Sequence, residues 1–275
     1  MYKIIACDLD ETLLSTDRSV SQGNIEAIKK ARELGVKFVL ATGRGFKTVQ
    51  GTLKELGLDN VKDEYVISFN GGAITENYNN RLLSFNGITF EFARELFNRG
   101  LDYDVCIHVY SKDVVYGYNM CDDEIAYLKG RMDFVEIKED NIDFLKDEEI
   151  AKVLYMNKDI NYLNKIEEEL ADITHEADVS YSSNRYIEFN RKGVNKGAGL
   201  RTLAKLLGVA IEDTMAIGDN LNDLAMIKDA GLGVGVANVV TKMKDDCEYI
   251  TEADHNHDAI KEVIEKFILN VEDEA

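Results

Sequence analysis

The chain has 275 residues, and 45% of them are hydrophobic, which is enough for a well-buried core and unlike a disordered composition. Lysine and arginine number 32 against 51 aspartates and glutamates, so the formal net charge is -19, a poor match for the phosphate backbone of DNA or RNA. A small phosphorylated ligand remains compatible with this charge, because a metal ion and a lysine can reverse the field locally.

Neither the start of the sequence nor any later stretch predicts export or membrane insertion. Asp8 interrupts the first apolar run almost at once, unlike a signal peptide, and no apolar stretch is long enough to cross a bilayer. The 4 cysteines form no Cys-x-x-Cys pair, and the 4 histidines show no zinc-ligand spacing with them. We therefore expect a cytoplasmic protein with reduced cysteines and with no membrane or nucleic-acid partner.

The first third of the sequence alternates apolar runs with helical patterns. One predicted helix begins after Ser21 and closes at Gly35, and a second one ends at Gly57. The apolar runs predict three strands: Lys3–Cys7, Val36–Ala41 and Tyr65–Phe69. Strands that alternate with helices are typical of right-handed crossovers and of a parallel sheet covered on both faces.

The pattern changes after about Ile74 and returns near Tyr186. The stretch between them contains predicted hairpin turns at Asn79-Asn80 and Lys112-Asp113, with a few helical patterns, and it favours a separate antiparallel module. From the apolar run Tyr186–Phe189 onward, strands and helices alternate again. The predicted fold is α/β, with a doubly wound parallel (Rossmann-like) core at residues 1–82 and 185–275 and an inserted α+β module at residues 83–184.

The first candidate catalytic motif is Asp8-Leu9-Asp10-Glu11-Thr12, at the end of the first predicted strand. Two carboxylates two residues apart at the mouth of a buried strand are costly unless something binds them. Mg2+ fits, because it takes hard oxygen ligands and leaves room for a phosphate, and a carboxylate beside it can attack phosphorus. A strand followed by a solvated acidic turn would give the same residues, so the motif needs support from the rest of the chain.

Polar residues follow two more predicted strands. Thr42 and Gly43 offer a hydroxyl and an amide that suit phosphate oxygens. Asp219 follows a later strand, with Asn222 and Asp223 one turn further on. Ligands of open parallel sheets bind in the crevice outside the carboxyl ends of the strands, so we expect all of these residues in one crevice. Asp219 would supply a third oxygen to the metal, and Asn222 and Asp223 would support the ligands.

Lys196 is at the start of a predicted helix, at a position that the apolar pattern of this helix does not explain. A lysine at a helix amino terminus is electrostatically disfavoured, so a nearby anion would account for it; a solvated surface lysine is the alternative.

Other known binding motifs are excluded because the residues that they require are missing. A calcium-binding loop from Asp8 has Leu13 and Ser19 where glycine and glutamate are required, and no Gly-x-x-x-x-Gly-Lys-Ser/Thr loop occurs.

These four signatures, in this order, resemble the haloacid dehalogenase-like phosphatase superfamily, and within it the Cof-type class with an α/β (class IIB) cap. The resemblance covers essentially the whole chain and makes the inserted module a cap domain. Glu11 departs from the pattern, since the family most often has glycine there. The matching motifs are Asp8-Leu9-Asp10-Glu11-Thr12, Thr42-Gly43-Arg44, Lys196, and Gly218-Asp219 with Asn222-Asp223.

The resemblance implies a role for each matched residue. Asp8 would attack phosphorus, and Asp10 would act as acid and base. Mg2+ would bind to Asp8, the backbone carbonyl of Asp10, and Asp219. The phosphoryl group would contact Thr42, Gly43, Lys196 and Asn222, whereas Asn70, Gly71 and Arg44 would face the cap or the entrance of the active site.

The sequence therefore favours a Mg2+-dependent phosphatase that hydrolyses small phosphorylated metabolites, such as sugar phosphates, through an aspartyl-phosphate intermediate. A phosphomutase and a non-catalytic sensor of phosphorylated metabolites are the alternatives. An intact set of Asp8, Asp10, Lys196 and Asp219 argues against the sensor, which needs no nucleophile.

Aromatic residues of the middle module are candidates for lining the substrate site, although strand aromatics more often pack in a core. No pattern in the sequence specifies the substrate or the oligomeric state. The candidates are Tyr103, His108, Tyr110, Tyr116, Tyr118 and Tyr155.

Overall fold

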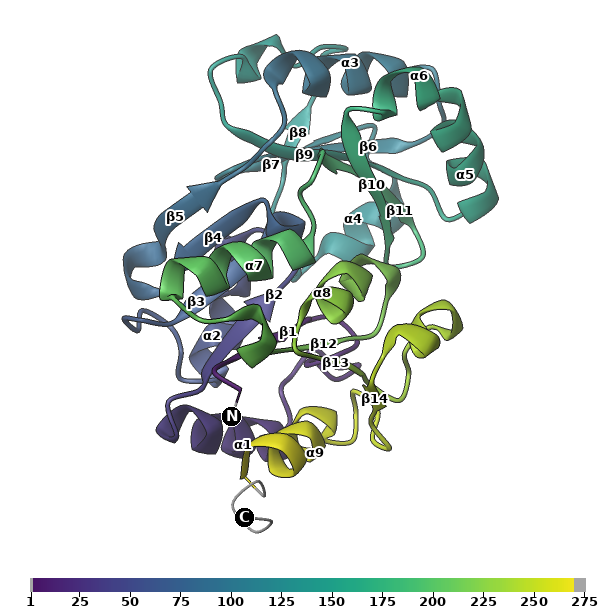
Figure 1. Cartoon of the computed structure of the whole chain (residues 1–275). Coiled ribbons are helices and arrows are strands. Elements are labelled where there is room, and N and C mark those ends of the chain that lie inside the picture. Colours follow the sequence, from purple (N-terminus) through teal and green to yellow (C-terminus); the bar gives the residue numbers. More distant parts are fainter. Residues whose placement is uncertain (1, 270–275) are drawn as a thin grey trace. The chain divides into compact units, whose positions relative to one another are not determined.

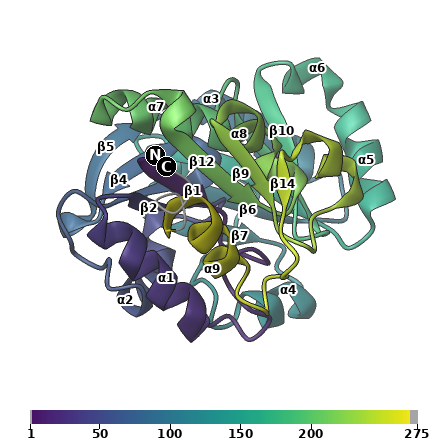
Figure 2. The ribbon, with the colours of Figure 1, turned by 60° about the horizontal axis from the view of Figure 1, so that its bottom comes forward.

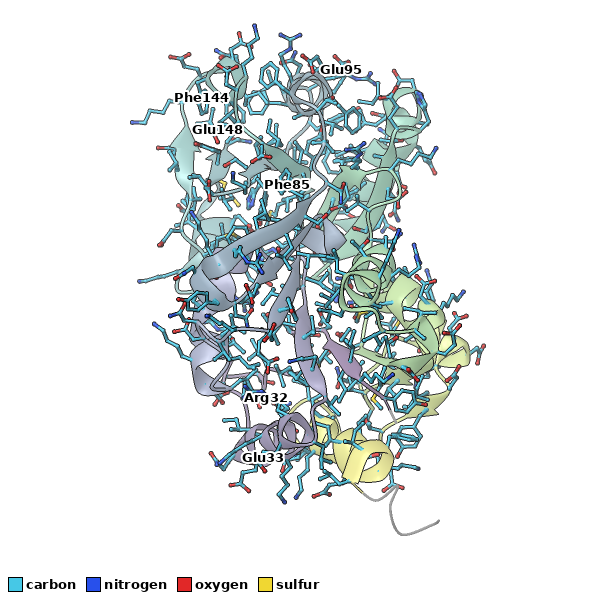
Figure 3. The ribbon with its side chains drawn as sticks, turned by 60° about the vertical axis from the view of Figure 1, so that its left-hand side comes forward. Arg32, Glu33, Phe85, Glu95, Phe144 and Glu148 are labelled. Carbon is cyan, nitrogen blue, oxygen red and sulfur yellow. The ribbon has the colours of Figure 1, made fainter. Side chains whose placement is uncertain are left out.

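A computed structural model describes residues 2–269 and divides the chain into two compact units (Figure 1). The first unit comprises Met1–Ser84 and Asn195–Ala275, and the second comprises Phe85–Val194. Phe85, labelled in Figure 3, is thus the first residue of the second unit. Both junctions lie further along the chain than those expected for an insertion at residues 83–184.

The first unit is built on an eight-stranded sheet with the order β14-β13-β12-β1-β2-β3-β4-β5. Its strands are β1 (Ile4–Cys7), β2 (Lys37–Ala41), β3 (Tyr65–Ser68), β4 (Ala73–Glu76), β5 (Arg81–Phe85), β12 (Thr214–Gly218), β13 (Leu232–Gly235) and β14 (Tyr249–Ile250). Its α-helices are α1 (Gln22–Glu33), α2 (Gln50–Glu55), α7 (Lys196–Leu207), α8 (Leu224–Asp229) and α9 (Ala259–Ile264). The pairs from β14 to β3 are parallel and β3–β4 is antiparallel, so the predicted α/β core is confirmed.

Alternation along β1 places apolar side chains on both faces of this sheet. Ile5 belongs to a cluster that includes residues of α1, α2 and α9, and Ala6 belongs to a cluster with residues of α7 and α8. Helices α1 and α9 lie side by side in Figure 2 and contact each other. The sheet is therefore covered on both faces, as a doubly wound fold requires.

Helix α1 shows how the sequence sets the boundaries of an element. The Ser21 side chain accepts a hydrogen bond from the Asn24 backbone N–H, as an N-cap residue does, and Gly35 follows the helix with φ 86°. Arg32, labelled in Figure 3, donates from Nε to Glu64 Oε1 at 3.0 Å. The predicted helix between Ser21 and Gly35 is confirmed.

The second unit contains a six-stranded sheet with the order β10-β11-β9-β6-β7-β8. Its strands are β6 (Cys106–Ser111), β7 (Val115–Tyr118), β8 (Val135–Ile137), β9 (Ile150–Met156), β10 (Ala177–Ser182) and β11 (Tyr186–Arg191). Its α-helices are α3 (Phe90–Gly100), α4 (Asp122–Leu128), α5 (Ile160–Glu169) and α6 (Ala171–Thr174). The pairs are antiparallel except β7–β8, as expected for an α+β module.

The sequence assigned one strand to the wrong sheet. Tyr186–Phe189 was expected to resume the parallel core, but β11 pairs antiparallel with β9 and β10 in the second unit. The physical reason is its alternation: Ile187 and Phe189 enter the apolar cluster of the second unit, whereas Glu188 does not. The first unit resumes only at Asn195, just before α7.

The aromatic candidates of the second unit divide between the two faces of its sheet. Tyr155 belongs to the apolar cluster, and Tyr103, Tyr116 and Tyr118 pack against it. His108 lies between two members of that cluster along β6, so it points to the other face, where its ring stacks on Tyr110. Four of the six candidates are therefore packing residues.

Within residues 2–269, no helix combines the length and the apolar character that crossing a bilayer requires.

Candidate active site

Three adjacent strands of the first unit end in the predicted polar residues. Asp8 follows β1, Thr42 follows β2, and Asp219 follows β12. Because β1 lies between β2 and β12 and pairs in parallel with both, the three carboxyl ends share one edge of the sheet. The strand order reverses direction at β1, which is the position where doubly wound sheets bind ligands.

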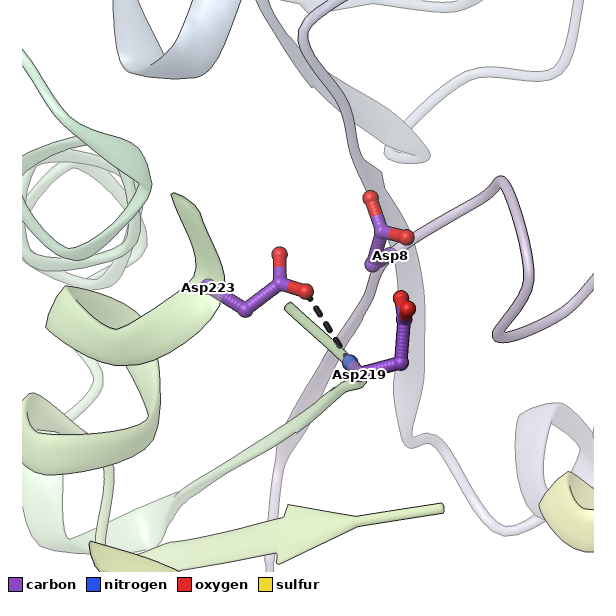
Figure 4. Close-up of side chains that lie close together, drawn as sticks. All are labelled: Asp8, Asp219 and Asp223. Atoms are coloured by element: carbon purple, nitrogen blue, oxygen red, sulfur yellow. Dashed lines mark hydrogen bonds between the residues drawn. The ribbon is translucent and has the colours of Figure 1, made fainter. Parts of the chain in front are cut away.

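Three buried carboxylates gather at this edge (Figure 4). Asp8, Asp219 and Asp223 are 6%, 4% and 0% exposed, and each offers an oxygen within 4.8 Å of the others. Thr12, which is fully buried, donates its hydroxyl to Asp219 Oδ1 at 2.8 Å. The loops after β1 and β12 are thus joined directly at the cluster.

Lys196 supplies the positive charge within the cluster. It is the first residue of α7, it is 0% exposed, and its Nζ donates to Asp8 Oδ1 and, at 2.6 Å, to Asp223 Oδ1. Asn195 caps the helix, since its side chain accepts from the Ala198 backbone N–H. The interpretation of Lys196 as a solvated surface residue is therefore wrong.

Asp223 is oriented by the backbone on the other side of its carboxylate. Its Oδ2 accepts from the backbone N–H of Asp219 at 3.0 Å, drawn in Figure 4, and from that of Asn220 at 3.1 Å. Gly218 is needed here, because a Cβ on it would lie 2.5 Å from the Asp223 Cβ. Asp223 thus holds both Lys196 and the loop that carries Asp219.

Burial and mutual repulsion perturb the acidity of this cluster. Burial, followed by the charge of Asp223, raises the pKa of Asp8 to about 7 against the opposing effect of Lys196. Burial, followed by the charges of Asp8 and Asp223, raises the pKa of Asp219 to about 9. Burial alone would lower the pKa of Lys196, but the charges of Asp223 and Asp8 outweigh it and raise that pKa.

The donor set fits a hard divalent cation. Three ionised carboxylates and one lysine sum to -3 + 1 = -2, which a divalent cation would balance. The cluster offers oxygen atoms alone, the ligands that such cations prefer over sulfur or nitrogen. The excess of buried negative charge that a cation would balance also raises the pKa values of Asp8 and Asp219, because it favours protonation of the carboxylates.

The predicted phosphate-binding loops also meet near the start of α7. The Asn70 backbone N–H donates to the Thr42 carbonyl at 3.0 Å, and a Cβ on Gly43 would lie 3.0 Å from Asn70 Oδ1. Gly71 has φ 94°, and a Cβ on it would lie 2.2 Å from the carbonyl oxygen of Asn195. Only glycine permits this approach, which brings the loop after β3 against the residue that precedes Lys196.

The Asp10 side chain is not one of the three carboxylates of this cluster, although its charge acts on Asp8. Arg44 holds both of its oxygens, donating from Nε to Oδ2 at 2.9 Å and from the second guanidinium nitrogen to Oδ1. The sequence predicts a metal contact from the backbone carbonyl of Asp10 and a place for Arg44 near the entrance, and both stay predictions; in the structure the two side chains bind each other. Asn222, half-buried, lies in a short 3-10 helix (Leu221–Asp223) beside the cluster.

Two further residues, to which the sequence patterns assign no role, belong to this site. Thr12 bonds to Asp219, and Asn195 caps the helix that presents Lys196. The signal for Asn195 was available, because asparagine directly before a helix is a strong N-cap candidate. Thr12 closes the motif that starts at Asp8, but its role could not be assigned from the sequence, because its partner lies 207 residues away.

The fold and the site together define an α/β enzyme with a carboxylate centre at the carboxyl ends of its parallel strands. The profile of the haloacid dehalogenase-like hydrolase family matches residues 5–264. The chain belongs to this family, and the Cof-type resemblance noted in the sequence is confirmed.

Phosphatases are prominent among the similar proteins. The chain is 31% identical to the 5-amino-6-(5-phospho-D-ribitylamino)uracil phosphatase YcsE of Bacillus subtilis, over 97% of this chain and 96% of that protein. It is 31% identical to a phosphoglycolate phosphatase of Methanosarcina acetivorans, over 95% of each. The chain is therefore a phosphoric monoester hydrolase of the haloacid dehalogenase-like type.

A solved structure extends this similarity to three dimensions. The haloacid dehalogenase-like hydrolase from Bacteroides thetaiotaomicron is 29% identical, with a TM-score of 0.83 over 98% of this chain and 100% of that one. A subclass IIB sugar phosphatase, at 20% identity, shares the fold with a TM-score of 0.84, over 96% of this chain and 98% of that one.

The raised pKa values of the carboxylate cluster predict how the metal-free protein responds to pH. In the folded protein without metal the pKa of Asp219 is raised to about 9, whereas in the unfolded chain it has the ordinary value of 3.8. Across this window the folded state binds more protons, so the free energy of unfolding falls as pH rises. Asp219→Asn cannot ionise, so without metal its melting temperature should fall less steeply and exceed that of the wild type at about pH 8.

Thermal melts in chelator between about pH 5 and pH 8 measure this difference. Asp147→Asn is the control, because it removes the same charge from an exposed position and should run parallel to the wild type. Parallel curves for the wild type and Asp219→Asn would contradict the assignment of buried repulsion to Asp219.

Proposed function

We propose that this protein is a Mg2+-dependent phosphatase of small organic phosphate monoesters that works through an aspartyl-phosphate on Asp8. The observation that carries the proposal is the buried contact of Lys196 with both Asp8 and Asp223 at the carboxyl edge of the sheet. A buried lysine that holds a carboxylate in place can equally hold a phosphoryl oxygen bound to that carboxylate. Phosphoryl transfer needs this kind of positioning and charge neutralisation.

The first step forms the covalent intermediate. A carboxylate oxygen of Asp8 attacks phosphorus, the bond from phosphorus to the ester oxygen breaks, and the departing alkoxide takes a proton from Asp10. Lys196, the Thr42 hydroxyl and the Gly43 amide neutralise or bind the phosphoryl oxygens, with Asn222 beside them. Arg44 holds both oxygens of Asp10, so delivery of the proton requires that one of these bonds opens.

The second step regenerates the enzyme. Asp10, now ionised, takes a proton from water, the water oxygen attacks phosphorus, and the bond from phosphorus to Asp8 breaks to release inorganic phosphate. Mg2+ bound by Asp8, Asp219 and the Asp10 backbone carbonyl would supply charge neutralisation for both transition states. Asp223 keeps Asp219 and Lys196 in place throughout.

The substrate class rests on the relatives and on the second unit. The two named relatives act, by their names, on a phosphorylated ribitylaminouracil and on phosphoglycolate, so proteins about equally similar to this chain differ in leaving group. We propose that Phe85–Val194 is the cap that selects the leaving group, and that it moves on its two chain crossings to exclude bulk water during the reaction.

Replacement of the nucleophile should abolish turnover. Asp8→Asn puts a poor nucleophile and a weaker metal ligand at the same position, so the rate of p-nitrophenyl phosphate hydrolysis should fall by about a thousandfold or more. Circular dichroism should show an intact fold. Asp245→Asn, at an exposed position, is the matched control and should keep wild-type activity. Near-normal activity of Asp8→Asn would rule out the covalent mechanism.

Removal of metal should stop the reaction reversibly. Hydrolysis of p-nitrophenyl phosphate should fall by about a hundredfold or more in chelator, because the carboxylates then lack the charge that balances them, and should return when Mg2+ is added in excess. Undiminished activity after exhaustive chelation would refute the requirement for a metal.

Changes in the second unit should alter selectivity more than chemistry. His108→Asn changes a buried polar side chain on the sheet face opposite the apolar cluster, and should change the ranking of a panel of phosphorylated metabolites by about tenfold. Hydrolysis of p-nitrophenyl phosphate should change far less. Tyr118→Phe, on the packed face, is the control. Equal effects of His108→Asn on all esters would show that this face does not select the substrate.

A further inference from the structure

The turn that follows Asp10 has an unfavourable backbone conformation. Glu11 has φ 59°, in the left-handed region that glycine adopts most easily, and its side chain is exposed. Its carbonyl oxygen accepts a hydrogen bond at 2.8 Å from Nδ2 of Asn238, which lies 227 residues away in the loop after β13. A contact from another loop therefore stabilises the residue between Asp10 and Thr12.

Both ends of the Asn238 amide are used, which fixes its orientation. Its Oδ1 accepts from the His255 backbone N–H at 3.1 Å, and its Nδ2 donates to Glu11. A backbone carbonyl can only accept and a backbone N–H can only donate, so the amide cannot be turned around without losing both bonds.

The turn at residues 236–240, which contains Asn238, also bonds to the loop that carries Asp219. The Val240 N–H donates to the Asp219 carbonyl at 2.9 Å, and the Val239 N–H closes the turn on the Val236 carbonyl at 2.8 Å. Residues 236–240 thus bind the backbone next to Asp10 through Asn238 and the backbone of Asp219 through Val240. The spacing between the two carboxylate-bearing loops is set on this side by one short turn.

Hydrogen bonds also connect the turn at residues 236–240 to helix α9 of the first unit. The Ala237 N–H donates to the Ala253 carbonyl at 3.2 Å, and the Glu262 carboxylate, on α9, accepts from the backbone N–H groups of Glu252 at 3.0 Å and Ala253 at 2.9 Å. The turn is therefore fixed to a helix of the core as well as to the site.

From these contacts we infer that Asn238 is a positioning residue for the reaction: it holds the Asp10-Glu11-Thr12 turn so that Asp10 and the Asp8 backbone keep their placement relative to Asp219. This inference rests on the proposed phosphatase function. Asn238 touches no reacting atom, and it acts through the Glu11 carbonyl. Loss of this contact should affect the transition state more than substrate binding, because a displacement of about 1 Å in a catalytic group can cost about a hundredfold in rate.

The test compares Asn238→Ala with Asn256→Ala. Asn256, in the segment between β14 and α9, also bonds to the loop after β1, since its Oδ1 accepts from the Thr16 N–H at 2.9 Å, and it is exposed. With p-nitrophenyl phosphate and Mg2+, Asn238→Ala should lower kcat about 10- to 100-fold and leave KM within about twofold. Asn256→Ala should keep both constants within about twofold of the wild type.

Hydrogen exchange gives a readout that does not depend on the reaction. The amides of Leu13 and Leu14 bond across the turn to the Leu9 carbonyl, at 3.2 and 2.9 Å. Their exchange should become faster in Asn238→Ala than in Asn256→Ala, while the rest of β1 keeps its protection. An inactive wild type with this exchange pattern would refute the proposed function and leave the structural role of Asn238 standing.

Asn238→Asp separates the two bonds of the amide. It keeps the acceptor for His255 and replaces the donor with an oxygen that faces the Glu11 carbonyl, so kcat should fall at least as far as in Asn238→Ala. Wild-type kcat in Asn238→Asp, unchanged exchange at Leu13 and Leu14 in Asn238→Ala, or a loss confined to KM would each overturn the inference.

Discussion

A buried lysine that bonds to two buried aspartates is the interaction on which the rest of this site depends. Lys196 has no contact with water, so its charge must be balanced by Asp8 and Asp223, and these in turn crowd Asp219. The strands, the glycines and the helix start serve this arrangement. Gly218 makes room for Asp223, Gly71 admits the Asn195 carbonyl, and Asn195 begins the helix that presents Lys196.

Much of the site could be predicted because its residues stand at the ends of regular elements. Asp8, Thr42 and Asp219 each follow an apolar run, and parallel strands bring such positions to one edge whatever the rest of the chain does. Lys196 could be recognised because a lysine at the amino terminus of a helix is electrostatically unfavourable unless an anion lies nearby. The fold class followed from the alternation of strands and helices, which depends on local periodicity.

Other features depend on contacts that no local pattern carries. The bond from Asn238 to Glu11, the pairing of Arg44 with Asp10, and the bond from Thr12 to Asp219 join loops that are distant in sequence. The assignment of β11 to the parallel core was an error of another kind, because the local sequence did contain the pattern that identifies its sheet. Polar residues alternate with Ile187 and Phe189, which is typical of an antiparallel strand with one apolar face, whereas strands of the parallel core are apolar on both faces.

The most direct test of the account is to trap the covalent intermediate. In Asp10→Asn, a good leaving group such as p-nitrophenolate needs no proton from an acid, so the first step should proceed while the second lacks its base. Mass spectrometry of the quenched variant, after mixing with p-nitrophenyl phosphate and Mg2+, should find a phosphoryl group on Asp8 in near-stoichiometric amount. A burst of p-nitrophenol without phosphorylation of Asp8, or with the phosphoryl group on another residue, would contradict the account.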